Sequence, residues 1–249
     1  MKVALIRIIF FAILILLWYL IVSIWHIPSY IAPSPFEVLN SFCYGFIKGN
    51  YLESIFYSLI RVIVGYLLAL SIGVFIGILI ARYYLLDITL GKTILSLQSI
   101  PSVAWVPLAL LWFGITDSAV IFIIILEALL PTALSTKNAM RNIPPNLIRA
   151  AQTLGSQGVH LYRNVIIKAM IPELVTGLRL SWAFAWRALI AGELFISGAG
   201  IGQNLEIGRS LADMPQVIAM ITTIGVIGYL TENVFFGTFE KKIRAVWGI

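Results

Sequence analysis

Long runs of apolar residues limit the fold of this chain more than any other feature. Residues 8–25 form an uncharged run of 18 residues. At about 1.5 Å rise per residue, a helix of that length comes close to crossing the roughly 30 Å hydrocarbon core of a bilayer. Five more runs lie at about 58–81, 93–115, 118–137, 174–196 and 215–238. They are predominantly apolar and do not alternate with polar residues, which is typical of helices rather than barrel strands. The sequence therefore predicts an all-α integral membrane protein with six transmembrane helices.

Composition excludes most other classes of protein. Of the 249 residues, 60% are hydrophobic and 11% are charged, whereas soluble domains carry roughly 25% charged residues. Cys43 is the only cysteine, and His26 and His160 are the only histidines. We therefore expect no intrachain disulfide and no metal site built from cysteine and histidine.

The basic residues indicate how the chain lies in the membrane. The net charge is +6, and the segment between the fourth and fifth runs has five basic residues before its first acid, Glu173: Lys137, Arg141, Arg149, Arg163 and Lys168. Cytoplasmic loops of membrane proteins are enriched in Lys and Arg. This segment is therefore predicted to be cytoplasmic, and with six spans both termini are cytoplasmic too. Because membrane topology accounts for the basic surplus, nucleic acid is not an expected partner.

The chain is expected to form one membrane domain over residues 1–249. We see no low-complexity segment, charged tail or convincing internal repeat, and inverted repeats are common in secondary transporters. Two segments are long enough to leave the bilayer. Residues 26–57 are predicted to lie outside, with an amphipathic helix at 36–47 on the outer surface, and residues 137–173 are predicted to lie inside.

The cytoplasmic loop at 142–172 has helical periodicity interrupted at Gly155. Pro144 and Pro145 favour a helix start, and Gly155 favours its C-terminal cap. Ser156 is a candidate cap for a second helix. Apolar residues of that helix recur at spacings of three and four: Val159, Tyr162, Val165, Ile166 and Met170. The pattern alone fits equally well a hairpin that packs on the protein's own spans and a docking surface for a cytoplasmic partner.

Part of this loop resembles a known motif. Residues 149–155, Arg-Ala-Ala-Gln-Thr-Leu-Gly, together with 166–167 and 169–172, resemble the "EAA" loop of binding-protein-dependent ABC importer permeases. In that family the loop is a coupling helix that lies in a groove of the ATPase subunit. Arg149 stands where the family usually has Glu, and Lys168 where it often has Pro. The resemblance implies an ATPase-coupling role for Arg149, Ala150, Ala151, Gly155, Ser156 and Pro172.

The resemblance extends to other segments and narrows the branch of the family. Residues 32–35, 58–62, 99–101, 105–107, 112–114, 191–193 and 198–202 are similar to permeases for nitrate, sulfonate, taurine and bicarbonate. This implies a multi-pass permease of the cell membrane that imports a small anion. It also implies three partners: a second permease copy, a pair of ATPase subunits that bind ATP and Mg, and an extracytoplasmic substrate-binding protein.

Charged residues inside the predicted spans are candidates for function. Arg187 lies well inside the fifth run and Glu127 near the middle of the fourth. Because an unpaired charge in hydrocarbon is costly, such residues face protein or a water-filled cavity. Two interpretations stay open: a buried ion pair between Glu127 and Arg187, and contact of Arg187 with the transported anion. Glu193, near the outer end of the fifth run, is a candidate for an outer gate or a structural hydrogen bond.

Proline and small residues predict features of helix packing. Pro101 and Pro107 each lack an amide donor, so both are expected to kink the third span, beside a pathway or only for packing. Gly65, Ala69, Gly73 and Gly77 recur every four residues in the second span. Such a stripe lets another helix approach closely.

Enzymatic function finds little support in the sequence. Residues 91–93, Gly-Lys-Thr, resemble the end of a P-loop, but Leu86 stands where its first glycine is required. His160 has no nucleophile or acid at a suggestive spacing. We therefore expect no catalytic residue, no metal and no cofactor on this chain. The alternative to an importer permease is an autonomous channel or secondary transporter, with a membrane-embedded enzyme as a third candidate.

Overall fold

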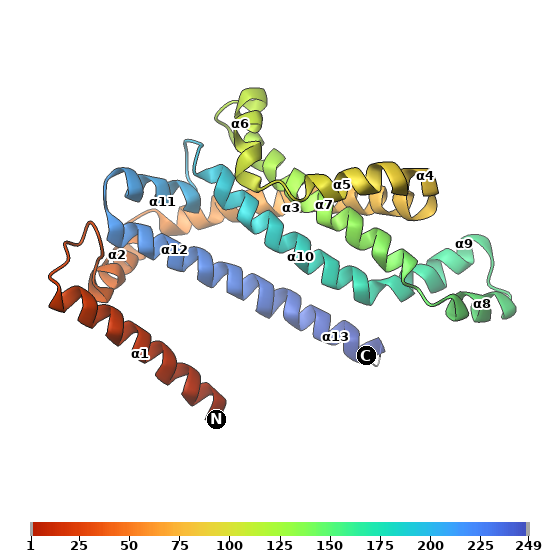
Figure 1. Cartoon of the computed structure of the whole chain (residues 1–249), viewed down its shortest axis with the longest axis horizontal. Helices are drawn as coiled ribbons and strands as arrows, with labels where there is room; N and C mark the ends of the chain where they lie inside the picture. Colours follow the sequence, from red (N-terminus) through yellow and green to blue (C-terminus); the bar gives the residue numbers. More distant parts are fainter. Residues whose placement is uncertain (1, 248–249) are drawn as a thin grey trace. The chain divides into compact units, whose positions relative to one another are not determined.

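The computed structural model describes residues 2–247, and every regular element in that range is a helix (Figure 1). The α-helices are α1 (Lys2–Ile24), α2 (Pro35–Ile47), α3 (Tyr51–Arg82), α4 (Tyr84–Leu86), α5 (Lys92–Leu97), α6 (Ser102–Phe113), α7 (Asp117–Arg141), α8 (Pro145–Thr153), α9 (Gly158–Leu161), α10 (Ile167–Glu193), α11 (Ile201–Ser210), α12 (Met214–Tyr229) and α13 (Gly237–Trp247). Three π-helical turns join them: η1 (Asp87–Gly91), η2 (Tyr162–Ile166) and η3 (Leu230–Phe236). The all-α prediction is confirmed.

Four helical stretches within the described residues are long and apolar enough to cross a membrane: Leu5–Ile24, Tyr51–Arg82, Asp117–Arg141 and Met214–Ile243. A fifth is present if Tyr84–Leu97 and Ser102–Phe113 count together as one broken span. The predicted span at 174–196 lies mostly in α10, whose 27 residues would extend about 40 Å. Charged residues along α10, among them Arg179 and Arg187, make it less apolar than the other four stretches.

The chain divides into two compact units. The first consists of Met1–Ser58 and Gly198–Val226, and the second of Leu59–Ser197 and Ile227–Ile249. In the first unit, α2 covers the predicted helix at 36–47 and begins at a capping box. The backbone N–H of Ser34 donates to Glu37 Oε2 at 2.6 Å, and the backbone N–H of Glu37 donates to Ser34 Oγ at 3.3 Å. Such reciprocal bonds satisfy amides at a helix start.

The stripe of small residues in α3 packs against α7 in the second unit. A Cβ atom added at Gly65 would lie 2.6 Å from Ile124 Cγ2, and one added at Gly77 would lie 2.5 Å from Thr136 Cβ. Ala69 is fully buried. The predicted close helix approach is therefore present, and α7 is the partner.

The contact between α7 and α10 is equally close and also polar. Ser181 Oγ donates to the carbonyl of Ala128 at 2.7 Å and lies 2.7 Å from Thr132 Oγ1. All three residues are buried. Buried hydroxyls that are fully paired in this way hold two helices in one register.

The predicted third span is broken and not merely kinked. Helix α5 ends at Leu97, α6 begins at Ser102, and their axes differ by 98°, so α6 stands steeply away from α5 in Figure 1. Pro101 has an extended backbone, with φ −61° and ψ 143°, which ends the helical path. Pro107 lies inside α6. The expectation of one helix kinked at both prolines is thus wrong at Pro101, where the helix stops and restarts.

Candidate functional site: the Gly155 hairpin and the Arg187 cavity

Helices α8 and α9 form a hairpin whose turn is built around Gly155. Pro145 occupies the first turn of α8, where its missing N–H costs nothing. At the other end the N–H of Gly155 donates to Gln152 O at 3.0 Å, and the N–H of Ser156 donates to Ala151 O at 2.9 Å. These are the two bonds of a Schellman cap. Gly155 has φ +86°, a left-handed conformation that L side chains rarely adopt.

The second half of the hairpin differs from the sequence-based prediction in two respects. Ser156 does not cap it: α9 begins at Gly158, and Ser156 Oγ lies 3.1 Å from His160 Nδ1. Val159 is 82% exposed, while Leu161 is buried. The π-turn η2 adds a residue to the turn, so the buried face shifts from the one that a regular 3.6-residue period predicts. Ile166 and Met170 are buried as expected.

The hairpin has a packed base and an exposed tip. Its base shares an apolar cluster with the end of α7 and the start of α10: Ala139, Ile143, Leu161, Ile166 and Met170. At the tip Leu154 is 87% exposed, and Val159 is also exposed. Arg149, Ala150 and Gly155 are exposed as well, Ala151 and Pro172 are half-buried, and Ser156 is buried. The tip therefore offers exposed apolar side chains to which another protein can bind.

Polar contacts link the base of the hairpin to the long helices. Arg82, the last residue of α3, donates from Nη1 to the Tyr162 hydroxyl at 2.8 Å. Asp87 of η1 binds Lys137 at 2.7 Å and Arg141 at 2.6 Å, both on α7. Asn142 Nδ2 donates to Glu173 Oε1 at 2.7 Å. The Arg82–Tyr162 bond thus joins the base of the hairpin to α3, while the other contacts join η1 to α7 and the end of α7 to α10.

A buried arginine, Arg61, links α3, α7 and α10 at the helix ends that lie away from the hairpin. Arg61 of α3 is 4% exposed, and its Nη1 lies 2.6 Å from Oε1 of the fully buried Glu193. Its Nη2 lies 2.8 Å from Asp117 Oδ1, at the start of α7. Glu193 therefore serves as a structural anion in this structure, where it is not open to a pathway. One guanidinium ties α3, α7 and α10 together.

Glu127 and Arg187 are not in contact. Their charges interact electrostatically, but within the described chain neither forms an ion pair of 4 Å or less with the other. Arg187 is exposed; its Nε donates to the Ala183 carbonyl at 3.0 Å, and its guanidinium carbon lies 4.6 Å from the Phe184 ring centre. Glu127 is 6% exposed. The candidate ion pair is absent here because Arg187 folds back along its own helix.

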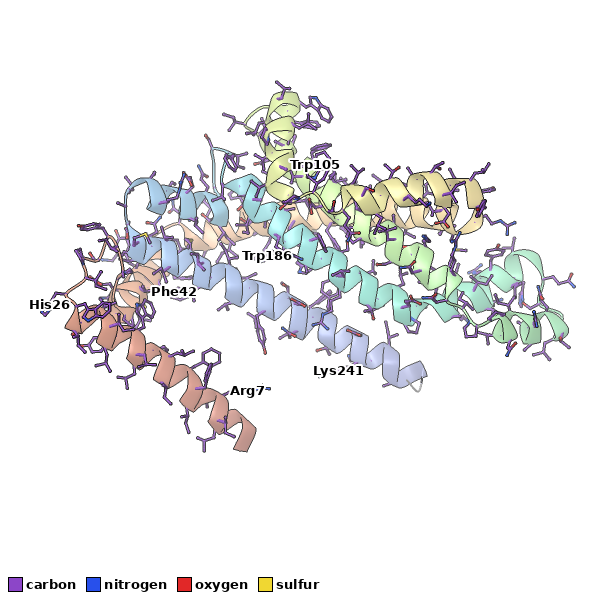
Figure 2. All side chains as sticks on the ribbon, viewed as in Figure 1. Arg7, His26, Phe42, Trp105, Trp186 and Lys241 are labelled. Carbon is purple, nitrogen blue, oxygen red and sulfur yellow. The ribbon has the colours of Figure 1, made fainter. Side chains whose placement is uncertain are left out.

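Arg187 instead lines a cavity within the second unit, which we name the Arg187 cavity. Its volume is about 410 Å³, and it is lined by Trp182, Ala183, Trp186, Arg187, Gly228 and Glu232. Glu232 belongs to η3 and lies 3.3 Å from Nη2 of Arg179. Trp186 is labelled on α10 in Figure 2. Pro101 and Pro107, the other candidate pathway residues, are exposed and do not line this cavity.

Sequence reasoning missed the role of Arg61 and Asp117. Arg61 is the fourth residue of the predicted run at 58–81, and Glu193 lies inside the predicted run at 174–196. Two opposite charges near the outer ends of two spans were the available signal. What the sequence does not give is which pairs of helices are neighbours.

Comparison with known proteins decides the family. The family described as "Binding-protein-dependent transport system inner membrane component" matches residues 69–244. The chain belongs to this family. It is 37% identical over 186 residues to a putative ABC transporter permease of Methanocaldococcus jannaschii, a match that covers 74% of this chain and 70% of that one. It is 28% identical to a putative aliphatic sulfonates transport permease of Bacillus subtilis, over 93% of this chain and 84% of that one.

The fold agrees with this assignment. A solved inward-facing structure of the MetNI methionine ABC transporter matches with a TM-score of 0.65 and 18% identity, over 77% of this chain and 95% of that chain. At that identity the likeness shows the fold alone. The family and the candidate spans place the chain in the cell membrane as a multi-pass protein. Permeases of this family act with an ATPase and a substrate-binding protein.

Proposed function

We propose that this chain is the permease subunit of an ATP-driven importer for a small anion, with an organosulfonate as the first candidate and taurine, nitrate or bicarbonate as the others. The observation that carries the proposal is the α8–α9 hairpin. It presents exposed apolar side chains at its tip, and its base packs against the end of α7 and the start of α10 and is hydrogen-bonded to α3. The sulfonate permease of Bacillus subtilis supports the substrate class.

The proposed assembly contains two copies of this permease, two ATPase subunits and an extracytoplasmic binding protein. ATP and Mg bind to the ATPase subunits and not to this chain. The permease crosses the membrane six times with both termini in the cytoplasm, α10 forming one span and the broken pair α5–α6 another. The whole chain then acts as one permease domain, with its hairpin in the ATPase groove.

Isolation from the native membrane tests the assembly. We expect a tagged chain, extracted in mild detergent, to recover a P-loop ATPase at a ratio of one ATPase to one permease, measured by quantitative mass spectrometry. A known importer complex extracted in parallel shows that the conditions preserve such contacts. Recovery of this chain alone would instead favour the autonomous channel or secondary transporter.

Substitution of Gly155 gives a second test, because Ala and Asn differ in how well they tolerate the left-handed backbone of the turn. A Cβ atom at Gly155 would meet nothing within 4 Å, so replacement by Ala costs only the left-handed backbone strain of about 1–2 kcal/mol. Gly155→Ala should therefore yield a folded permease that retains less ATPase on co-purification. Gly155→Asn should retain more than Ala, because Asn tolerates this conformation better. If both variants retained wild-type amounts of ATPase, the hairpin would not be the docking element.

A further inference from the structure

The Arg187 cavity contains hydrogen-bond donors without acceptors. Arg187 uses its Nε for the Ala183 carbonyl, and among residues 2–247 its two Nη groups have no hydrogen-bond or ion-pair partner. Trp186 is 8% exposed, and its Nε1 has no acceptor in the same range. By contrast, Trp182 Nε1 donates to Thr231 Oγ1 at 3.1 Å. Donor groups that are open to a cavity can bind a ligand that accepts hydrogen bonds.

The position of the guanidinium along α10 argues against lipid tails as its surroundings. The bond from Nε to Ala183 directs the side chain toward the N-terminus of α10, away from the nearer helix end at Glu193. Ala183 lies about 15 Å from that end and about 24 Å from the other, at 1.5 Å per residue. An arginine that reaches for the headgroups would point the opposite way. A charge near mid-span faces protein or a water-filled path.

Two carboxylates near the cavity leave the guanidinium available. Glu232 lines the cavity and is engaged by Arg179 at 3.3 Å. Glu127 interacts with Arg187 electrostatically without a hydrogen bond to it. The cavity therefore keeps a positively charged group with two open donor edges, beside the N–H of Trp186.

The walls of the cavity are flat and apolar apart from Arg187 and Glu232. Two indole rings, Ala183 and Gly228 form the rest of the lining. The volume of about 410 Å³ lies in the range of small-molecule sites, in which apolar walls surround a few orienting polar groups. A bare inorganic ion would leave the indole walls without a partner. The π-turn η3 supplies Glu232, and π-turns are frequent at functional sites.

We propose that the Arg187 cavity is the anion subsite of the transport pathway, and that it takes a small organic oxyanion: a sulfonate or carboxylate with a short apolar tail. The Nη groups of Arg187 bind two oxygens of the headgroup in parallel. Trp186 Nε1 donates to the headgroup, and the tail lies against the indole rings. This inference rests on the proposed importer function.

The test uses the importer complex recovered from the native membrane, reconstituted with its binding protein in vesicles of phosphatidylcholine. ATP-driven uptake of labelled ethanesulfonate is compared with uptake of nitrate. We expect Arg187→Gln to lower ethanesulfonate uptake about tenfold or more, and Trp186→Phe to lower it about threefold to tenfold. The ATPase content and melting temperature of both variant complexes should stay near wild-type values, because the contacts of Arg187 with Ala183 and Phe184 lie within α10 and Trp186→Phe keeps an aromatic ring. Arg7→Gln and Trp112→Phe, outside the cavity, are the matched controls and should leave uptake unchanged.

The possible outcomes separate the subsite from the function on which it rests. If the wild-type complex takes up neither anion with ATP, the proposed function fails, and the subsite with it. If the wild type imports ethanesulfonate and Arg187→Gln imports it equally fast, the function stands and the subsite is wrong. Faster uptake of nitrate than of ethanesulfonate would overturn the organic ligand class. An anionic lipid headgroup is the other source of oxyanion. Arg187 binds lipid if phosphatidylglycerol raises the melting temperature of the wild type but not of Arg187→Gln, while ethanesulfonate raises the melting temperature of neither protein.

Discussion

Replacing Arg61 by methionine is expected to lower the free energy of unfolding of the permease by about 3–5 kcal/mol. Methionine fills a similar volume but leaves the fully buried carboxylate of Glu193 without its cation at 2.6 Å. A buried carboxylate that loses its cation is no longer compensated for the desolvation of its charge. The measurement is unfolding of the purified permease in detergent micelles titrated with dodecyl sulfate.

Two further variants test whether burial of the charge is the cause. Asp117→Asn removes the other anionic partner of Arg61. Because the side chain of Asp117 is 60% exposed, this change should cost at most about 1 kcal/mol. The double variant Arg61→Met with Glu193→Gln should recover much of the lost stability, because the buried charge is gone. If Asp117→Asn were as damaging as Arg61→Met, the ion pair with Glu193 would not be the main contribution of Arg61.

Replacing Gly177 by alanine is expected to have the second largest effect, a loss of about 1–3 kcal/mol. A Cβ atom at Gly177 would lie 2.2 Å from Cβ of Ser135 on α7, too close for two carbon atoms. The clash cannot be relieved by rotating a side chain, because Cβ of Ser135 is fixed to its backbone. Helices α7 and α10 must therefore separate, which also strains the buried bonds of Ser181.

The opposite helix offers a compensating change. Ser135→Gly combined with Gly177→Ala moves the small side chain from α7 to α10. The Cβ atom of residue 177 would then lie 3.5 Å from the Cα atom of residue 135. This pair should restore most of the stability in the same titration. Gly225→Ala is the matched control: a Cβ atom there would meet nothing within 4 Å, and alanine is the better helix former by about 1 kcal/mol. Equal losses from Gly177→Ala and Gly225→Ala would argue against the clash.

Local patterns were sufficient to predict several features of this protein. The apolar runs predicted an all-helical membrane chain because helices satisfy their backbone hydrogen bonds within the segment. The stripe from Gly65 to Gly77 predicted a close helix contact, and Gly155 predicted the C-terminal cap of a loop helix, because each depends on the absence of a side chain. The motif at 149–155 indicated the family that the comparison over residues 69–244 establishes.

Only the tertiary structure decided which distant residues meet. Arg61 and Glu193 are 132 positions apart, and no period in the sequence shows that α3 and α10 bring them together. The same holds for Arg187, which the sequence allowed to pair with Glu127 and which the structure places in a cavity lined by two tryptophans. The helix break at Pro101 and the shifted buried face in α9, before η2, also lay beyond periodicity. Hydropathy and helical period depend on neighbours along the chain, whereas ion pairs and cavities depend on helix packing.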